Sequence, residues 1–296
     1  MNKNRNVFHL FLLIFTSFIW GNAFVAQSVG ADYVGPFTFL AIRTWMALVL
    51  LIPFMRGQYK KVNLDQKEKK TLILGGFVCG TFLFLGSVFQ QIGIAYTTTA
   101  KAGFITTLYM IIVPFVSIFL GKKPSLKIWV AVILGISGLY MLTMQGTLSI
   151  NIGDIWMVAC ACAFAGQILC VHKAAPRVNP ILLSGVQFLA CALYASIGFL
   201  FEPFQMSDIQ MALPTLLYAG IFSSGIGYTF QIIGQRGLNP TVASIAMCME
   251  SVFSALAGWF WLHQGLTTSE LIGCALMFVA ILITQIPEKK QDTSPA

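Results

Sequence analysis

Residues 97–127 read TTTAKAGFITTLYMIIVPFVSIFLGKKPSLK, and this stretch decides the fold. Within it, residues 97–119 carry a single charged side chain, Lys101, in an otherwise largely apolar run. A run of roughly 20 such residues is long enough to cross the hydrocarbon core of a bilayer as a helix. The turn that follows contains Gly121, Pro124 and three lysines, so the stretch predicts a membrane-spanning helix with a basic connection at its end.

Similar apolar runs recur along the whole chain of 296 residues, of which 57% are hydrophobic and 9% are charged. A soluble domain carries roughly 25% charged residues, so water is not the main solvent of this chain. The runs are continuous rather than alternating, which favours helices over barrel strands. We therefore predict an all-α polytopic membrane protein with ten transmembrane helices, near residues 7–27, 34–55, 71–94, 97–119, 128–144, 152–171, 181–201, 212–233, 240–262 and 269–286.

The basic residues fall on one side of this predicted bundle. Of the 18 Lys and Arg residues, 16 lie at the two termini or in the loops after the second, fourth, sixth and eighth helices. The positive-inside rule then predicts a multi-pass protein of the cell (inner) membrane with cytoplasmic N- and C-termini. Because orientation accounts for the net charge of +8, we expect no nucleic-acid partner, and Lys67, Lys69 and Lys70 are interpreted as a solvated flank facing lipid rather than a binding patch.

The beginning of the chain also fits a cleaved signal peptide, since basic residues precede an apolar run. We prefer a retained first helix, because its removal would leave nine helices. All seven cysteines fall inside apolar segments, and neither a CxxC pair nor a neighbouring histidine suggests a metal site. No cofactor and no metal are therefore expected. The three histidines lie near helix ends and far from one another, which argues against an enzyme.

The two halves of the sequence resemble each other. A displacement of 144 residues takes Pro36 to Pro180, and one of 142 takes residues 95–98 to residues 237–240. We interpret residues 1–146 and 147–296 as two five-helix repeats. Five is an odd number, so the second repeat is inverted in the membrane, an arrangement suited to alternating access. The alternative is that duplication merely builds a stable bundle.

These features resemble the drug/metabolite transporter superfamily, specifically its EamA-type ten-helix carriers. The residues that carry the resemblance are Trp20 to Phe24, Pro36 with Arg43, AYTTTAKAGF at 95–104 leading to Leu108, Tyr109 and Pro114, and LNPTVAS at 238–244 leading to MESVF at 249–253. Family members usually have Glu-Pro where this chain has Glu250-Ser251, and a basic-acidic pair where it has His263-Gln264. The resemblance implies secondary transport of small metabolites without ATP.

Three charged residues lie inside the predicted membrane core: Arg43, Lys101 and Glu250. Ionisable groups at this depth are costly and usually mark a transport pathway. We expect Arg43 and Glu250 to line a substrate cavity near the midplane, with Arg43 accepting an anionic group and Glu250 binding an amine or exchanging a proton. The alternative is a buried ion pair between the second and ninth helices. Lys101 either lines the cavity or snorkels to the interface.

Polar and aromatic residues at mid-helix add to this candidate substrate site. Glutamines at positions 167 and 235 are interpreted as interhelical hydrogen-bonding residues instead. Trp20 and Asn22 flank Gly21, and either side chain could contact a substrate, although a Trp in a bundle is usually core. The full expected substrate site comprises Arg43, Glu250, Trp20, Asn22, Lys101, Tyr109, Tyr228, Gln231 and Gln187.

The sequence as a whole predicts a secondary active transporter of small metabolites, with amino acids or related amphipathic solutes as the class and export as the direction. A drug-efflux carrier of the same fold is the first alternative, and a channel-like pore is the second. The expected partners are a small-molecule substrate and the lipid bilayer. Gly76 and Gly80 predict close helix packing, and their spacing leaves a homodimer open.

Overall fold

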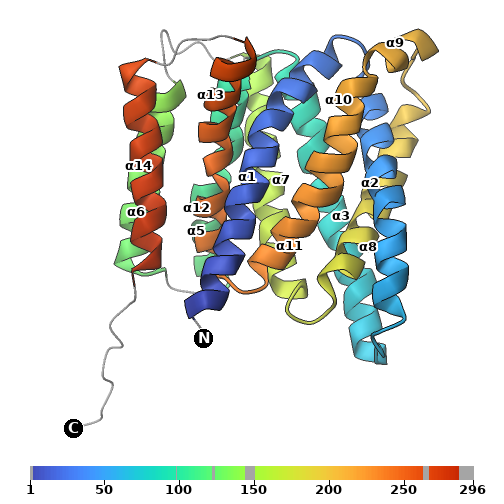
Figure 1. Cartoon of the computed structure of the whole chain (residues 1–296), viewed down its shortest axis with the longest axis horizontal. Helices are drawn as coiled ribbons and strands as arrows, with labels where there is room; N and C mark the ends of the chain where they lie inside the picture. The colour runs from blue at the N-terminus through green and yellow to red at the C-terminus, as the bar shows by residue number, and fades with distance from the viewer. Residues whose placement is uncertain (1–2, 98, 122–123, 144–150, 263–266, 287–296) are drawn as a thin grey trace.

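The computed structural model describes residues 3–97, 99–121, 124–143, 151–262 and 267–286, and all regular structure in these ranges is helical. The helices stand side by side as a single bundle (Figure 1). Eight helical stretches are long and apolar enough to cross a membrane by length and composition, and two shorter apolar helices accompany them. The chain is thus a polytopic all-α protein, and the ten predicted transmembrane segments are all helical. Their arrangement is that of two inverted five-helix repeats.

The helices follow the order of the predicted segments. The first half contains α1 (Lys3–Ala31), α2 (Pro36–Tyr59), α3 (Gln66–Ile94), α4 (Thr99–Thr107), α5 (Tyr109–Phe119) and α6 (Leu126–Thr143). The second half contains α7 (Ile152–Ala174), α8 (Pro180–Phe199), α9 (Met206–Met211), α10 (Leu213–Leu217), the π-helix η1 (Tyr218–Tyr228), α11 (Thr229–Gln235), α12 (Pro240–Met247), α13 (Met249–Leu262) and α14 (Thr268–Gln285).

Several helix starts are fixed by local sequence. At α8 and α12 an asparagine precedes a proline, and the side chain of Asn179 or Asn239 accepts a hydrogen bond from a backbone N–H of the first turn. Proline suits this position because the missing N–H would have no partner inside the helix. At α3, Asp65 and Glu68 form a capping box with each other's backbone N–H groups. These caps fix the residues at which the three helices begin.

Helices of each half pack against helices of the other half. In the first half α3 packs on α7 and α8, and in the second half η1 packs on α1 and α2. Likewise α4 and α5 contact α7, whereas α12 and α13 contact α1. The pairs α2 with α8 and α6 with α14 join counterparts from the two halves. Extensive contact between the halves is expected of two repeats around a central site.

The fourth and ninth transmembrane segments are each interrupted in the middle. One break lies at Leu108, between α4 and α5, and the other lies at Cys248, between α12 and α13. The N–H of Leu108 bonds to the Ile105 carbonyl at 3.2 Å, and the N–H of Cys248 bonds to the Ile245 carbonyl at 3.2 Å and to the Ser244 carbonyl at 3.1 Å. The bonds to Ile105 and Ile245 are those of a 3₁₀ turn, and at Cys248 an α-helical bond accompanies it. Paired interruptions at corresponding positions in two repeats point to a binding site in transporter folds.

The eighth segment departs from α-helical geometry. The short helix α9, which precedes it, was not predicted. Residues 212–233 were expected to form one helix, but they divide into α10, η1 and the beginning of α11. Regular α-helix resumes only at Thr229. Helix α9 precedes this segment at one end of the bundle (Figure 1). Stretches of π-helix are uncommon and occur frequently at functional sites.

The glycine pair of α3 serves packing within the chain. A Cβ added at Gly80 would lie 2.5 Å from the Gln187 carbonyl oxygen, and one added at Gly76 would lie 2.5 Å from Val186. Only glycine permits such close contact between α3 and α8. The predicted close packing is therefore present between two helices of one chain, and the homodimer stays a prediction.

The two ends of the described chain and two of the connections lie on the same face of the bundle, as the sequence predicted. Helix α1 begins and α14 ends at the same face, where α2 is also connected to α3 and α7 to α8 (Figure 1). These are the connections to which the sequence assigned the basic residues. The predicted boundary between residues 146 and 147 falls outside the described residues, and so does His263.

Candidate functional site

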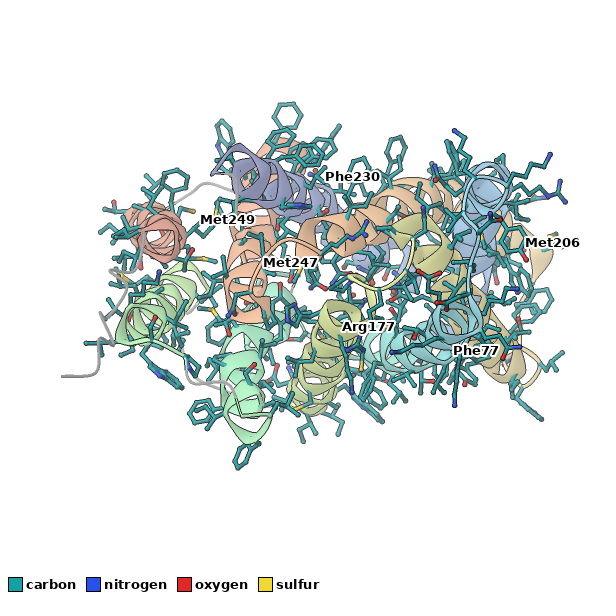
Figure 2. The ribbon with its side chains drawn as sticks, turned by 90° about the horizontal axis from the view of Figure 1, so that it is seen from below. Phe77, Arg177, Met206, Phe230, Met247 and Met249 are labelled. Atoms are coloured by element: carbon teal, nitrogen blue, oxygen red, sulfur yellow. The ribbon has the colours of Figure 1, made fainter. Side chains whose placement is uncertain are left out.

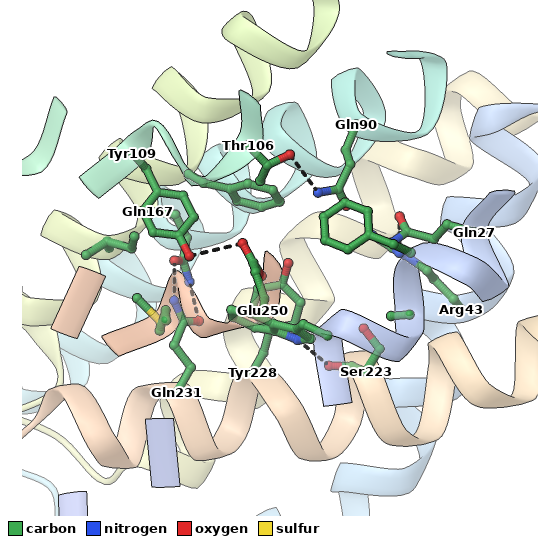
Figure 3. Close-up of a pocket in the computed structure, with 16 residues that line it drawn as sticks. Gln27, Arg43, Gln90, Thr106, Tyr109, Gln167, Ser223, Tyr228, Gln231 and Glu250 are labelled. Atoms are coloured by element: carbon green, nitrogen blue, oxygen red, sulfur yellow. Dashed lines mark hydrogen bonds between the residues drawn. The ribbon is translucent and has the colours of Figure 1, made fainter. Parts of the chain in front are cut away.

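A small cavity lies where the two interrupted segments meet. Its volume is about 30 Å³, room for roughly two water molecules. Figure 3 shows side chains from both halves converging on this cavity. It is lined by Trp20, Ala23, Phe24, Gln27, Arg43, Gln90, Thr106, Tyr109, Phe164, Gln167, Ile168, Ser223, Tyr228, Gln231, Met247 and Glu250.

Glu250 is the carboxyl group of the cavity. It follows the break at Cys248 by two residues, and 4% of its surface is exposed. The Tyr109 hydroxyl, from the first residue of α5, donates a hydrogen bond of 3.0 Å to Glu250 Oε1 (Figure 3). A buried carboxyl needs hydrogen-bond donors to offset the loss of water. The two interrupted segments thus contribute one member each to this pair.

Arg43 is the cation of the cavity, and 3% of its surface is exposed. Its Nη1 donates a hydrogen bond of 3.2 Å to Gln27 Oε1 on α1, and its guanidinium carbon lies 5.9 Å from the centre of the Phe39 ring. Its Nε is buried and has no hydrogen-bond partner in the part of the chain that the structure describes. Arg43 and Glu250 line the same cavity and form no ion pair with each other. Arg43 therefore presents unused donor capacity next to the cavity.

Three glutamines form an amide cluster on the opposite wall. The Gln167 amide nitrogen donates to Gln187 Oε1 at 3.0 Å and to Gln231 Oε1 at 3.2 Å, and Gln231 donates back to Gln167 at 3.0 Å. Gln167 and Gln231 line the cavity. Gln187 lies behind them, and within the described ranges its own amide nitrogen is buried without a hydrogen-bond partner. This cluster joins α7, α8 and α11.

The π-helix supplies a backbone acceptor to the site. The Trp20 indole nitrogen donates a hydrogen bond of 3.1 Å to the Ser223 carbonyl oxygen within η1. The Tyr228 ring, at the end of η1, lies 4.6 Å from the Trp20 ring between centroids. Trp20 therefore fixes the π-helix against α1 and presents an aromatic face at the cavity wall.

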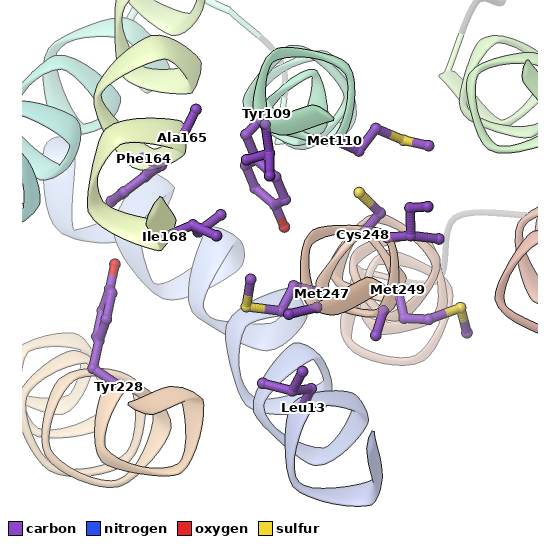
Figure 4. Close-up of a cluster of buried hydrophobic side chains, with 14 of the residues drawn as sticks. Leu13, Tyr109, Met110, Phe164, Ala165, Ile168, Tyr228, Met247, Cys248 and Met249 are labelled. Atoms are coloured by element: carbon purple, nitrogen blue, oxygen red, sulfur yellow. The ribbon is translucent and has the colours of Figure 1, made fainter. Parts of the chain in front are cut away.

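Apolar side chains complete the wall between these polar groups. Phe164 and Ile168 of α7 face Met247, which ends α12, across the space between the helices (Figure 4). The hydroxyl groups of Tyr109 and Tyr228 point into this space from opposite sides (Figure 4). The cavity thus combines an apolar wall with one cation, one carboxyl and several amide and hydroxyl groups. Such a lining suits a small solute that has both charged and apolar parts.

The structure brings six of the nine predicted site residues to this cavity: Trp20, Arg43, Tyr109, Tyr228, Gln231 and Glu250. Asn22 faces away, because it accepts a hydrogen bond of 3.2 Å from the Trp261 indole at the outside of the bundle. Gln187 does not line the cavity but supports Gln167. Lys101 belongs to α4, and its side chain lies outside the described part.

Sequence reasoning did not assign five polar lining residues to the site: Gln27, Gln90, Thr106, Gln167 and Ser223. The signal for Gln27 was present, because Trp20, Ala23, Phe24 and Gln27 follow helical spacing and share one face of α1. Thr106 accepts a 3.4 Å hydrogen bond from the Gln90 amide.

The outcome for the two interhelical glutamines differs. Gln167 forms the expected bonds and also lines the cavity. For Gln235 the expectation was wrong, since both its amide atoms are buried and have no hydrogen-bond partner among the described residues.

Ser251 stands where family members usually carry proline. Its hydroxyl donates to the Gly103 carbonyl at 3.2 Å and lies 3.4 Å from the Thr107 hydroxyl. Proline has no such donor, so this bond between α13 and α4 depends on the serine. Within the described ranges, no group of three or more His, Cys, Asp or Glu side chains is placed to hold a metal ion.

Comparison with known proteins matches both halves of the chain to one family. The model of the EamA-like transporter family covers residues 7–144 and 151–286. An uncharacterised transporter of Archaeoglobus fulgidus is 28% identical, over 93% of this chain and 84% of its own length. The threonine/homoserine exporter RhtA of Escherichia coli K12 is 22% identical, over 95% of this chain and 92% of its own length. A solved crystal structure, 19% identical, shares the fold with a TM-score of 0.73 and covers 92% of this chain and 95% of that chain.

Proposed function

The chain belongs to the EamA-like transporter family, and from this premise we propose that it exports amino acids or closely related amphipathic solutes by alternating access. Both halves of a multi-pass bundle match the family, whose named relatives are transporters. The finer assignment, to a solute class and a direction, rests on the lining of the central cavity and on the relatives.

One observation carries the solute class: the cavity holds one buried cation and one buried carboxyl that do not neutralise each other. An α-amino acid carries a carboxylate and an ammonium group on the same carbon atom. Arg43 offers donors for the carboxylate, and Glu250 offers an acceptor for the ammonium group. The apolar wall at Phe164 and Ile168 would then face the side chain of the solute.

The relatives support the same class. The exporter RhtA, named for threonine and homoserine, covers nearly the full length of this chain. Its name supports both the amino-acid class and the outward direction. We further propose that the protein lies in the cytoplasmic membrane with both termini in the cytoplasm, since this places the basic connections on the inner side.

We infer the step of the proposed cycle from the volume of the cavity. About 30 Å³ is far below the several hundred Å³ of an ordinary small-molecule pocket, which supports a conformation that is closed around the site. Solute entry requires the helices around the cavity to separate. The breaks at Leu108 and Cys248 are the natural points of movement, because a 3₁₀ turn is a common helix hinge.

The test is counterflow in proteoliposomes that contain the full-length protein. Vesicles loaded with unlabelled threonine should accumulate labelled threonine transiently, and the rate should saturate with concentration. Flux that rises without saturation would indicate a pore instead. Counterflow with lipophilic cations but none with a panel of amino acids would replace the proposal by drug efflux.

A further inference from the structure

A second cavity lies at the basic face of the bundle, away from the central site. It forms a groove of about 360 Å³ along the seam between α3 and α7. Neither the family match nor the central cavity accounts for it. The residues that line this groove are Lys67, Lys70, Thr71, Leu74, Gly75, Val78, Cys170, Lys173, Ala174 and Arg177.

Four cations surround one end of the groove. Lys67 and Lys70 come from the first turns of α3, and Lys173 comes from the last turn of α7. Arg177 follows α7, where its backbone N–H bonds to the Ala174 carbonyl at 3.0 Å and continues the helical turn. Figure 2, seen from below, shows Arg177 at this end of the bundle.

The four cations have no carboxylate partner. All four side chains are exposed, and within the described ranges none forms an ion pair or a side-chain hydrogen bond. The nearest acidic residues along α3, Asp65 and Glu68, bond to each other's backbone in the capping box and do not line the groove. The groove therefore presents uncompensated positive charge, which attracts anions.

The other end of the groove is apolar. Leu74 and Val78, 59% and 39% exposed, continue the lining along the same face of α3. From Lys67 to Val78 the helix rises about 16 Å, so the lining runs from the level of the membrane surface into the hydrocarbon. Gly75 and Ala174 form the floor, where a Cβ on the glycine would lie 3.2 Å from the alanine Cβ. Small residues thus let α3 and α7 approach closely beneath the groove.

We propose that this groove binds an anionic phospholipid, with the headgroup phosphate among the four cations and an acyl chain along Leu74 and Val78. A soluble anion would use only the charged end, whereas a lipid uses both the charged and the apolar end. Basic pockets between transmembrane helices are typical sites for acidic lipid headgroups. The proposal departs from the interpretation of Lys67 and Lys70 as a solvated flank, because these lysines line one groove with cations from another helix.

The test compares lipids on the full-length protein in detergent. Phosphatidylglycerol and phosphatidylcholine with identical acyl chains are titrated, and bound lipid is counted by native mass spectrometry. We expect phosphatidylglycerol to bind the wild type at least about tenfold more tightly. Equal binding of the two lipids would overturn the proposal without the need for any variant.

A matched pair of variants then locates the binding. The groove variant carries Lys67→Gln, Lys70→Gln, Lys173→Gln and Arg177→Gln, and the control carries Arg56→Gln, Lys60→Gln, Lys61→Gln and Lys69→Gln, with the same loss of charge outside the groove. We expect the groove variant to lose the preference for phosphatidylglycerol and the control to keep it. Equal loss in both would contradict a site at this seam.

A final comparison separates the lipid from free phosphate. Leu74→Trp should fill the apolar end and weaken phosphatidylglycerol binding several-fold, while it leaves the cations in place. Millimolar inorganic phosphate should not displace the lipid from the wild type. If phosphate competes fully and Leu74→Trp has no effect, the occupant is a soluble anion and the lipid assignment is wrong.

Discussion

The Tyr109 hydroxyl donates a hydrogen bond of 3.0 Å to Glu250, and both residues lie directly after the interruptions of their segments. Tyr109 follows Leu108 by one residue, Glu250 follows Cys248 by two, and both line the cavity. The two halves of the chain therefore meet through residues next to their helix interruptions. A buried carboxyl is paired with a neutral donor rather than with a cation.

The charge of Glu250 and of Arg43 should be required for transport. Glu250→Gln removes the charge and keeps the size of the side chain, whereas Arg43→Gln removes the charge and shortens the side chain. We expect each to reduce counterflow by about tenfold or more, equivalent to roughly 1.4 kcal/mol. Transport at the wild-type rate by both variants, in protein that elutes as a folded monodisperse species, would mean that the cavity does not bind the solute.

Removal of the Tyr109 hydroxyl should lower the stability of the protein. Tyr109→Phe keeps the ring in the apolar cluster and deletes only the donor to Glu250. We expect a loss of stability of about 0.6 to 1.7 kcal/mol, the range measured for interhelical hydrogen bonds. Thermal unfolding in detergent measures this loss, and an unchanged midpoint would indicate that the bond contributes nothing.

Two tryptophans with similar hydrogen bonds should respond differently. Trp20 donates to Ser223 at the cavity, whereas Trp261 donates to Asn22 at the outside of the bundle. We expect Trp20→Phe to reduce counterflow about threefold or more, as for the loss of one interhelical bond of ~0.6 kcal/mol. Trp261→Phe should leave it unchanged. An equal change of counterflow in both variants would contradict a special role for Trp20 at the cavity.

Two glycines in the helices also form a matched pair. A Cβ at Gly80 would lie 2.6 Å from the Ala190 Cβ, whereas one at Gly57 in α2 would have nothing within 4 Å. We expect Gly80→Ala to destabilise the protein by about 1–3 kcal/mol through overpacking. Gly57→Ala should be neutral or stabilising by up to about 1 kcal/mol, because alanine favours a helix. Thermal unfolding of both variants against wild type checks the order.

Glu202 should protect the beginning of α2 from solvent exchange. Its carboxylate accepts the backbone N–H groups of Phe37 at 3.2 Å and Thr38 at 2.5 Å, so a residue of the second half caps a helix of the first. We expect Glu202→Ala to accelerate hydrogen exchange of these two amides and to cost about 1 kcal/mol of stability. Glu68→Ala removes a carboxylate from the capping box of α3 and should leave the two α2 amides unchanged.

The sequence predicted the membrane fold well, because its signals are strong and repeated. Continuous apolar runs located all ten segments, and the resemblance at residues 95–104 matched the family found later. It predicted the interruptions poorly. Leu108 and Cys248 sit inside apolar runs with neither glycine nor proline at the break, so no local punctuation marked them.

Prediction of the central cavity succeeded where a charge or a mid-helix aromatic was unusual in its setting, as at Arg43, Glu250 and Tyr228. It failed at Asn22. This residue lies two positions after Trp20 on α1 and therefore faces another side of the helix, and the sequence did not show which side faces the cavity. It also missed Thr106, whose small hydroxyl is common in transmembrane helices and carries little signal.

The narrowness of the closed cavity bears on how this carrier would tell solutes apart. A cavity with room for about two water molecules is too small to be complementary in shape to a particular solute. Selectivity between solutes would then depend on the free energy needed to widen the cavity around each solute, and not on the fit of the solute to the closed cavity. We expect bulkier amino acids to be rejected mainly through slower turnover, with less change in their affinity for the open form.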